Sequence, residues 1–421
     1  MLDVWASNSL SGRLNRQGQW ECSFTYQPTA RHEDAISVMM PVRPESWLHH
    51  GLHPIFEQNL PEGALRLWFD TVVAKTLPHY DDLELLRITG RSQIGRLRYS
   101  AHGSPLPEQQ DEVPAVSLED ILRAKGTEDL FEELMHMYAL HSGLSGAQPK
   151  VMVRVEDSHT ADAGPARLTL KMPTHIVKTW KPDEFPELAL NEALCMLAAE
   201  RAGLPVAETT LSDDRRLLVI TRFDRNPNGS FKGFEDCCVL HNKSAKQKYT
   251  GSYEQVAKVL RTYTLPTDRR QTLRQLFSMV ALSVAIRNGD AHLKNFGILY
   301  DSPAPRQGAI APVFDLVTTT PYLPQDAMAL TLAGTKRWPG RKALEDFGRI
   351  ACSLSADEVR TCLESVEQGV SETMEELKAW AQEEPAFRQV GRAMRAAWEA
   401  GLQDLAPTSK QGQAADTTPS P

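Results

Sequence analysis

Four polar side chains cluster in the sequence NGDAHLKNF, at Asp290, His292, Lys294 and Asn295. The apolar stretch before them predicts a buried helix, and the stretch after them predicts a strand. An aspartate five residues ahead of an asparagine, between two such elements, is typical of a kinase catalytic loop. Asp290 would orient an acceptor hydroxyl, and the amide oxygen of Asn295 would bind Mg²⁺, which prefers oxygen ligands. A plain Asn-Gly-Asp turn is the alternative interpretation.

Asp315 lies further along the chain in the apolar run VFDL. A carboxylate in such a run is costly to bury without a cation or another partner. Strands are expected at 296–299 and 313–316, with a turn near 301–305 between them. An aspartate beside such a hairpin matches the second metal-binding aspartate of kinases. The alternative is a strand-end aspartate that caps a turn.

A phosphate-binding element is predicted upstream, in the stretch GLSGAQ at 143–148. Two glycines and small side chains would let the backbone approach phosphate oxygens closely. The spacing is not that of a Walker A loop, since Lys150 is followed by Val151 rather than by Ser or Thr. An ordinary turn between a helix and a strand is the alternative.

A lysine for the phosphates is predicted at Lys178, in the strand-like stretch HIVK. A lysine inside a strand can point into a cleft, and the alternative is an edge-strand lysine that faces water. Glu192 lies on the next predicted helix and is either the partner of Lys178 or a solvated carboxylate. Phosphoryl transfer from ATP needs such a cation, a phosphate cradle, metal ligands and a carboxylate for the hydroxyl.

Hydrophobic periodicity predicts the elements that would position these residues. Helices are expected at 81–88, 118–138, 188–203 and 273–285, and one is expected to start in Asn59–Glu62 with its proline near the first turn. Short strands are expected within residues 1–30, and further strands at 175–179 and 217–223. The Pro- and Ser-rich segment 101–117 is predicted to be a linker.

Composition excludes several classes of protein. The 421 residues suffice for two domains, and the net charge of -8 gives no chain-wide basic field for nucleic acid, although a local basic patch stays possible. The six cysteines are scattered without a C-x-x-C pair, so we expect reduced thiols, no zinc site and a cytoplasmic location. No apolar run reaches the roughly 18 residues of a membrane span, and the first residues do not resemble a signal peptide.

Several short stretches resemble HipA-family serine/threonine kinases, the toxin halves of bacterial toxin–antitoxin modules. They are LSGAQPK at 144–150, HIVK at 175–178, TRFDR at 221–225, GDAHLKNF at 289–296 and PVFD at 312–315. NLPE at 59–62 and GRSQIG at 90–95 resemble the N-terminal subdomain of the same family. The resemblance therefore covers nearly the whole chain.

The resemblance implies an α+β, two-lobed protein-kinase-like (HipA-like) fold with an N-terminal subdomain and a mostly helical C-terminal lobe. The implied division is an N-terminal subdomain at 1–105, a kinase N-lobe at 106–225, a helical C-lobe at 226–405 and a disordered tail at 406–421. The N-lobe would carry the phosphate loop and the ATP lysine, and the C-lobe would carry the catalytic loop and the metal-binding aspartate. ATP would bind between the lobes.

The resemblance also implies a role for each motif residue. Asp290 would be the catalytic aspartate, Asn295 and Asp315 would bind Mg²⁺, and Lys178 would contact the ATP phosphates. The other residues expected to contact ATP are Ser145, Gly146, Ala147, Gln148, Pro149 and Lys150 in the phosphate loop, Thr221, Arg222 and Phe223 at the hinge, and His292 and Lys294 in the catalytic loop.

The phosphate loop departs from the family pattern at one position. Family members often carry Ser-x-Ser there, and the first serine is the usual site of inhibitory autophosphorylation. Here the first position is Gly143 and the second is Ser145, while Ser142 lies one residue upstream. Autophosphorylation is therefore expected at Ser145, with Ser142 or no site at all as the alternatives.

The resemblance implies partners that the residues themselves do not identify. We expect a HipB-like helix-turn-helix antitoxin, contact with operator DNA mainly through that antitoxin, and a protein substrate such as an aminoacyl-tRNA synthetase. A small-molecule kinase is one alternative, but its loop typically reads His-Gly-Asp where this chain has Asn288-Gly289-Asp290. A catalytically silent co-repressor is the other, and the intact Lys178 and Asp315 argue against it.

Overall fold

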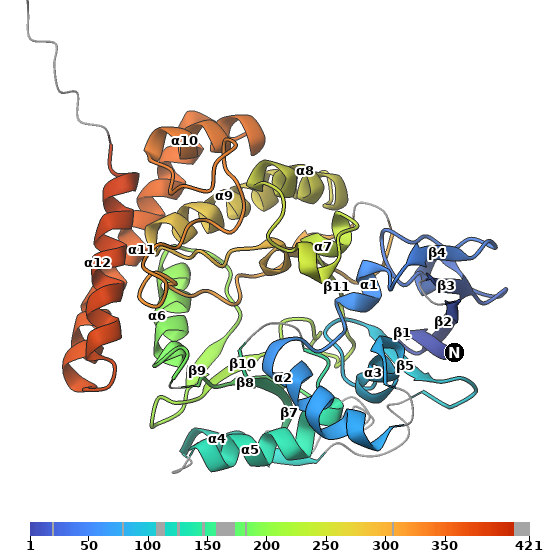
Figure 1. The fold of residues 1–421 in the computed structure, drawn as a ribbon. Helices are drawn as coiled ribbons and strands as arrows, with labels where there is room; N and C mark the ends of the chain where they lie inside the picture. Colours follow the sequence, from blue (N-terminus) through green and yellow to red (C-terminus); the bar gives the residue numbers. More distant parts are fainter. Residues whose placement is uncertain are drawn as a thin grey trace, which may run out of the picture.

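The described part of the chain folds into three β-sheets and a mostly helical part (Figure 1). The computed structural model describes residues 1–18, 21–77, 80–106, 114–123, 127–144, 148–156, 173–181, 183–304 and 307–407. Ser145, Gly146 and Ala147 of the predicted phosphate loop, and residues 408–421 of the predicted tail, lie outside these ranges.

The N-terminal unit is built on a five-stranded antiparallel sheet of order β4-β3-β2-β1-β5. Its strands are β1 (Leu2–Ala6), β2 (Ser9–Gln17), β3 (Glu21–Tyr26), β4 (Trp47–His50) and β5 (Leu97–Ala101). Its helices are α1 (Pro54–Glu57), α2 (Gly63–Trp68) and α3 (Asp82–Thr89), with short 3₁₀ or π turns at His32–Asp34, Phe69–Val73 and Ala74–Thr76. The predicted N-terminal strands and the helix predicted at 81–88 are confirmed.

Helix α2 begins later than the NLPE motif predicted. Glu62 has extended backbone angles and forms the N-cap, so the first helical residue is Gly63 and Pro61 lies before the helix. The extended backbone leaves the Glu62 side chain outside the helix, where it pairs with a lysine of the distant catalytic loop.

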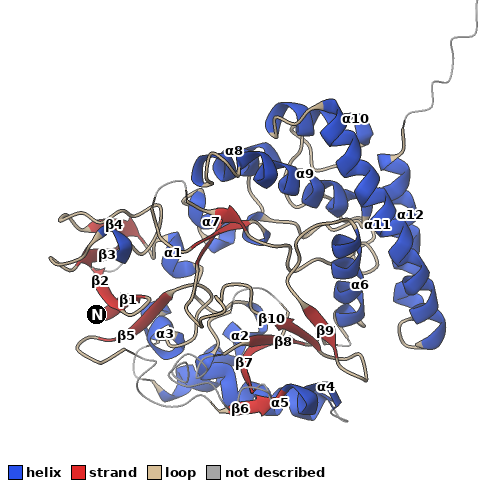
Figure 2. Cartoon of the chain, turned by 180° about the vertical axis from the view of Figure 1, so that it is seen from behind, coloured by secondary structure: helices blue, strands red, loops and turns tan. Residues whose placement is uncertain are grey.

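The second sheet has the order β6-β7-β8-β10-β9, in which only β6 and β7 run parallel. Its strands are β6 (Ala115–Ser117), β7 (Lys150–Glu156), β8 (His175–Lys178), β9 (Thr209–Leu211) and β10 (Leu218–Thr221). Helices α4 (Leu118–Arg123) and α5 (Thr127–Tyr138), followed by a 3₁₀ turn at Ala139–His141, lie against it (Figure 2).

One prediction for this region is corrected. The predicted linker 101–117 was wrong at both ends, because Ala101 is the last residue of β5 and residues 115–117 pair with β7 and extend the sheet by one strand, while its residues 107–113 lie outside the described ranges. Within the helix predicted at 118–138, α4 and α5 are helical, and residues 124–126 between them lie outside the described ranges. Pairing to a neighbouring strand overrides the weak local preference of a Pro- and Ser-rich segment.

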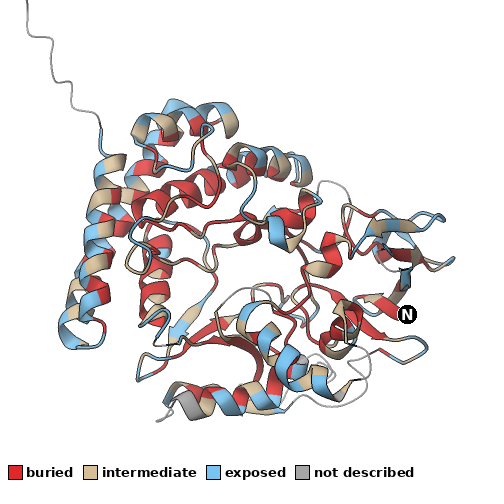
Figure 3. Cartoon of the chain, viewed as in Figure 1, coloured by how far each residue is buried: buried red, intermediate tan, exposed pale blue. Residues whose placement is uncertain are grey.

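The C-terminal part is mostly helical and carries a small antiparallel sheet of order β11-β12-β13. Its strands are β11 (Gly233–Asp236), β12 (Gly297–Tyr300) and β13 (Ala309–Ile310). Its α-helices are α6 (Leu188–Arg201), α7 (Cys237–Leu240), α8 (Tyr253–Tyr263), α9 (Arg269–Ala285), α10 (Arg341–Asp346), α11 (Ala356–Glu383) and α12 (Arg388–Leu405). Short turns lie at Ala245–Gln247, Leu293–Asn295 and Phe347–Ala351. Helix α9 is buried along most of its length and packs against α8, α11 and α12 (Figure 3).

The predicted hairpin around Asp315 was wrong in its second strand. The strand that pairs with β12 is β13, and Val313 makes only an isolated parallel bridge with Val206. Asp315 has φ +61°, a left-handed conformation that a β-strand does not contain. Val313 and Leu316 are buried by packing against the helical part, so their apolar character signals burial rather than strand pairing.

Buried polar contacts join the N-terminal unit to the rest of the molecule. The carboxylate of Glu235 on β11 accepts hydrogen bonds from the Ser37 hydroxyl and the Val38 amide, at 2.7 and 2.8 Å. Arg222 donates to the carbonyl oxygen of Gln93 at 2.7 Å. A buried polar group without a hydrogen-bond partner costs free energy, so these contacts favour one position of the N-terminal unit against the rest of the molecule.

Two further predictions can be compared with the fold. All six cysteines are buried and unpaired, as expected for reduced thiols. Within the described residues, no helix combines the length and apolar character that crossing a membrane would require.

Candidate active site

A cleft of about 530 Å³ opens where the N-terminal unit, the second sheet and the helical part meet. The second sheet contributes Lys150 and Lys178 to its lining, and the helical part contributes Asp290, Asn295 and Asp315. The structure therefore brings together the residues that the sequence placed in one centre.

The end of α9 delivers Asp290 to this cleft. The Asp290 amide donates to the Asn288 side chain at 3.0 Å, which closes a tight turn. Gly289 is favoured there, because a Cβ atom would lie 2.7 Å from the backbone oxygen of Ala327. Burial raises the pKa of Asp290, although a hydrogen bond from Tyr249 acts in the opposite direction. Its side chain is still 44% exposed, so an incoming hydroxyl can reach it.

The two predicted metal ligands face each other. The Asn295 side-chain nitrogen lies 3.3 Å from Oδ2 of Asp315, and the Asn295 side-chain oxygen accepts from the His292 amide at 3.2 Å. The Asn295 amide must therefore turn before its oxygen can bind a cation that Asp315 also binds. The described residues contain no group of three His, Cys, Asp or Glu side chains suited to a metal.

Lys178 is held by two carboxylates. Its Nζ atom lies 2.6 Å from Oε1 of Glu192 and 2.6 Å from Oδ1 of Asp315. Strand β8 lies between β7 and β10, and Lys178 is buried, so it is not an edge-strand lysine that faces water. Glu192 is fully buried on α6 and is the partner of Lys178 rather than a solvated carboxylate.

The pKa directions agree with this geometry. Burial would raise the pKa of Asp315, but the ammonium groups of Lys178 and Lys150 outweigh it and hold that pKa well below its usual range. Burial would lower the pKa of Lys178, but Asp315 and Glu192 raise it overall. Both Lys178 and Asp315 therefore stay charged at neutral pH.

Lys150 is a second buried cation of the cleft. It lies directly opposite Lys178 in the antiparallel register of β7 and β8, which places both side chains on one face of the sheet. Burial lowers the pKa of Lys150, and among the described residues its Nζ atom has no hydrogen-bond partner. A buried ammonium without a partner fits an anionic ligand in the cleft.

The other described residues predicted to contact ATP line the cleft, but some of their side chains already bond to other parts of the protein. Gln148 and Pro149 line the cleft beside Thr179, and the Gln148 side chain donates to the Thr179 carbonyl at 3.0 Å. The guanidinium of Arg222 lines the cleft but is committed to Asp224, at 2.6 Å, and to Gln93. Its side chain therefore ties residues 221–224 to the N-terminal unit.

Three aromatic rings form an apolar wall of the cleft next to residues 221–224. The Phe223 ring lies 5.6 Å from that of Phe234 and 5.2 Å from that of Phe314, measured between centroids. Thr221 and Ile94 line the cleft beside them. Such a wall suits the flat face of a nucleotide base.

Sequence reasoning missed two contacts of the catalytic loop. A carboxylate oxygen of Glu62, in the N-terminal unit, lies 2.5 Å from Nζ of Lys294. Burial alone would raise the pKa of Glu62 and lower that of Lys294. The pairing outweighs burial, so the pKa of Glu62 is lowered and that of Lys294 is raised. Tyr249 donates a 2.6 Å hydrogen bond to Asp290, and its ring lies 5.1 Å from that of His292. The NLPE motif was a signal for Glu62, whereas the sequence around Tyr249 held none.

Ser142 and Gly143 lie just before the undescribed part of the phosphate loop. The Ser142 hydroxyl is buried, donates to the Tyr138 carbonyl and accepts from the Met152 amide, both at 2.9 Å. Gly143 packs against Gln93, and a Cβ atom there would lie 2.1 Å from the end of the Gln93 side chain.

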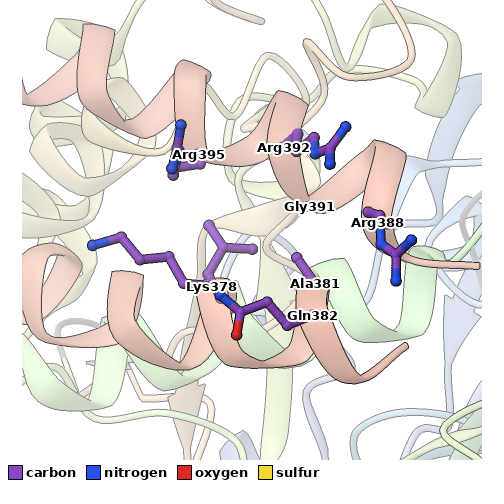
Figure 4. A pocket seen from close by; sticks show the side chains of 8 residues that line it. Lys378, Ala381, Gln382, Arg388, Gly391, Arg392 and Arg395 are labelled. Atoms are coloured by element: carbon purple, nitrogen blue, oxygen red, sulfur yellow. The ribbon is translucent and has the colours of Figure 1, made fainter. Parts of the chain in front are cut away.

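A separate groove of about 330 Å³ lies between α11 and α12 (Figure 4). Leu377 and Lys378 of α11 and Arg388, Arg392 and Arg395 of α12 are among the residues that line it. It is a local basic patch of the kind the overall charge left possible. As far as the chain is described, it shares no lining residue with the cleft.

Comparison with known proteins places the chain in a family. The profile of the HipA N-terminal domain matches residues 2–100, and that of the HipA-like C-terminal domain matches residues 142–375. Two proteins of Sinorhizobium fredii named as candidate kinases are similar. Y4mE is 28% identical over 76% of this chain and 78% of its own length, and Y4dM is 27% identical over 86% and 80%.

A solved structure has the same fold. A chain of the Shewanella oneidensis complex of HipA, HipB and operator DNA aligns with a TM-score of 0.68, covers 96% of both chains and is 18% identical. The predicted two-lobed, HipA-like fold is thereby confirmed. Since the C-terminal profile alone spans more than half of the sequence, the chain belongs to the HipA family.

Proposed function

We propose that this protein is an ATP- and Mg²⁺-dependent serine/threonine protein kinase that acts as the toxin of a toxin–antitoxin module. The observation that carries this proposal is the meeting of Asp290, Asn295, Asp315 and the carboxylate-held Lys178 in one cleft. The family membership and the candidate kinases among the relatives support kinase activity.

ATP would lie with its base against the wall formed by Phe223, Phe234 and Phe314, and with its phosphates toward Lys150 and Lys178. The buried, unpartnered ammonium of Lys150 gains a counter-charge from the phosphates, which repays part of the cost of burying it. Asn295 and Asp315 would hold Mg²⁺, which would neutralise charge on the phosphate oxygens.

Asp290 would receive the acceptor. The hydroxyl oxygen of a serine or threonine attacks the γ-phosphorus of ATP, the bond to the ADP oxygen breaks, and the hydroxyl proton passes toward Asp290. Because the pKa of Asp290 is raised above its ordinary value, its carboxylate is a better proton acceptor than that of a free aspartate. The carboxylate also orients the hydroxyl before transfer.

The biological setting rests on the family. We infer growth inhibition through phosphorylation of a translation component such as an aminoacyl-tRNA synthetase, a cytoplasmic location, a HipB-like antitoxin and contact with operator DNA mainly through it. The solved relative that contains HipA, HipB and operator DNA supports the last two. Autophosphorylation is proposed at Ser145, because the Ser142 hydroxyl is buried and used twice within the fold.

The test compares wild type with Asp290→Asn, which keeps the shape of the side chain, and with Asp346→Asn as an exposed control in α10. Purified proteins are incubated with MgATP and a bacterial lysate, and phosphopeptides, including any at Ser145, are identified by mass spectrometry. Asp290→Asn should reduce transfer about 10²–10⁴-fold and relieve growth arrest.

Two results would count against the proposal. Full phosphotransfer by Asp290→Asn would remove the assigned catalytic residue. Phosphorylation of small hydroxyl metabolites, with no protein in the lysate modified, would instead indicate a small-molecule kinase.

A further inference from the structure

Tyr249 contacts the residue at which phosphoryl transfer would occur. Its hydroxyl donates to Oδ1 of Asp290 at 2.6 Å, and its ring packs edge-on against His292. Within the described part of the chain, the other carboxylate oxygen of Asp290, Oδ2, has no hydrogen-bond donor from the protein. Of the two carboxylate oxygens, Oδ1 therefore accepts a hydrogen bond from the protein, while Oδ2 is open to a substrate.

The main chain around Tyr249 is fixed to its surroundings. The carbonyl of Lys248 accepts from the Leu293 amide of the catalytic loop at 3.1 Å, and the carbonyl of Tyr249 accepts from Lys336 at 3.1 Å. The next carbonyl, of Thr250, accepts from Lys243 at 2.6 Å. These three hydrogen bonds hold the backbone on both sides of Tyr249, whose hydroxyl reaches Asp290.

We propose that Tyr249 is a positioning residue for the phosphoryl transfer, whose hydroxyl holds Oδ1 of Asp290 so that Oδ2 is presented to the acceptor hydroxyl. This inference rests on the proposed function. An ionised carboxylate has acceptor positions for several hydrogen bonds, so one oxygen can be held while the other receives the substrate. Holding the side chain in one rotamer removes motion that would otherwise separate Asp290 from the acceptor.

The position of the ring adds a steric consequence. Tyr249 is 42% exposed, lines the cleft and occupies Oδ1 of Asp290 with its hydroxyl. An acceptor hydroxyl would therefore meet the carboxylate at Oδ2. Tyr249 would then restrict the direction of approach as well as the orientation of the carboxylate.

The charges around Asp290 give the proposal a second readout. Lys248 favours the carboxylate, Asp315 and Asp326 oppose it, and the His292 ring nitrogen lies 4.0 Å from Oδ1. The hydrogen bond from Tyr249 also favours the carboxylate. Removal of the hydroxyl should therefore raise the pKa of Asp290 and move the acidic limb of the kcat profile to higher pH.

The experiment uses the full-length protein, MgATP and myelin basic protein as a generic acceptor. Tyr249→Phe keeps the ring on His292 and removes only the hydroxyl. Its kcat should fall about tenfold, the effect of one lost hydrogen bond to a charged group, while KM for ATP stays within about twofold. Tyr263→Phe is the matched control, because that hydroxyl contacts Met39 away from the cleft, and it should change neither quantity.

The possible outcomes are separable. If wild type transfers no more phosphate than Asp290→Asn, the proposed function itself fails. If wild type is active and Tyr249→Phe matches it in kcat and pH profile, the positioning role is overturned. A lower unfolding midpoint with a raised KM for ATP would show a merely structural role. Phosphotyrosine at position 249 in wild type after incubation with ATP would make Tyr249 an acceptor instead, which also overturns the proposal.

Discussion

The ion pair between Glu62 and Lys294 offers a direct test of how strongly the N-terminal unit is bound to the predicted catalytic loop. Glu62 is the N-cap residue of α2, and Lys294 lies between Asp290, the proposed catalytic residue, and the metal-ligand candidate Asn295. Their charged atoms are 2.5 Å apart, and the two side chains are 22% and 7% exposed, respectively. The variant Glu62→Gln removes the negative charge and leaves the ammonium of Lys294 buried.

The size of the effect follows from this burial. Removing one partner of a fully buried ion pair costs about 3–5 kcal/mol, and water reaches part of Glu62, so we expect a loss of about 2–3 kcal/mol in the free energy of unfolding. An exposed pair contributes about 0–1 kcal/mol, so the control Lys342→Met, which breaks the exposed pair with Asp346, should cost far less.

The assay is urea unfolding followed by tryptophan fluorescence for wild type, Glu62→Gln, Lys294→Met and the double variant. The double variant should be more stable than the sum of the single losses predicts, by about 1.5 kcal/mol or more, because each single change strands a charge that the double change removes. Additive losses within about 0.5 kcal/mol would refute the reasoning.

The pH dependence of the same pair has a definite sign. The pKa of Glu62 is lower in the folded protein than its ordinary value, so the unfolded state binds the proton more readily. The pair therefore contributes fully above the ordinary glutamate pKa of about 4.3 and loses its contribution as the pH falls through the lower folded value. The stability gap between wild type and Glu62→Gln should close as the pH is lowered from about 5 to about 3.

Two further predictions concern buried cations and histidines. Lys150→Met should raise the free energy of unfolding by about 1 kcal/mol and weaken ATP binding tenfold or more, because it removes a buried ammonium that has no hydrogen-bond partner among the described residues and would gain one from the phosphates. Urea unfolding and calorimetric titration with MgATP measure both, and unchanged ATP affinity would contradict it. Burial lowers the pKa of His53 to about 4, and its Nδ1 accepts from the Ile55 amide, so stability should fall as the pH drops below the unfolded value of about 6.5. His53→Asn, which keeps an acceptor for that amide, should flatten this dependence, whereas parallel curves for the two proteins would contradict it.

The catalytic loop could be predicted from sequence because its geometry is local. A buried helix ends before Asp290, and a strand begins soon after Asn295, so the spacing alone places both side chains in one short turn. Lys178 could also be singled out from the sequence, because a lysine in an apolar strand is rarely buried unless it has a charged partner. Its partners were harder to assign, because they lie on other elements.

Tyr249 and the backbone at Asp315 could not be predicted in this way. Tyr249 lies in the loop between α7 and α8, and only the pairing of that loop with Leu293 brings it to Asp290. The apolar residues around Asp315 favour a strand, yet tertiary packing fixes a left-handed turn there. Local preference is overridden in both places by contacts between segments distant in the sequence.

The charges at the candidate site suggest why a cation should accompany ATP. Lys150 and Lys178 balance Glu192 and Asp315, and Lys178 is already shared by both carboxylates at 2.6 Å. The phosphates of ATP would add several negative charges beside Asp315, and Lys150 alone would not offset them. A divalent cation held by Asp315 and Asn295 would restore the balance. The nitrogen of the Asn295 side chain now lies 3.3 Å from Asp315, so that side chain would turn its oxygen inward when the cation takes this place.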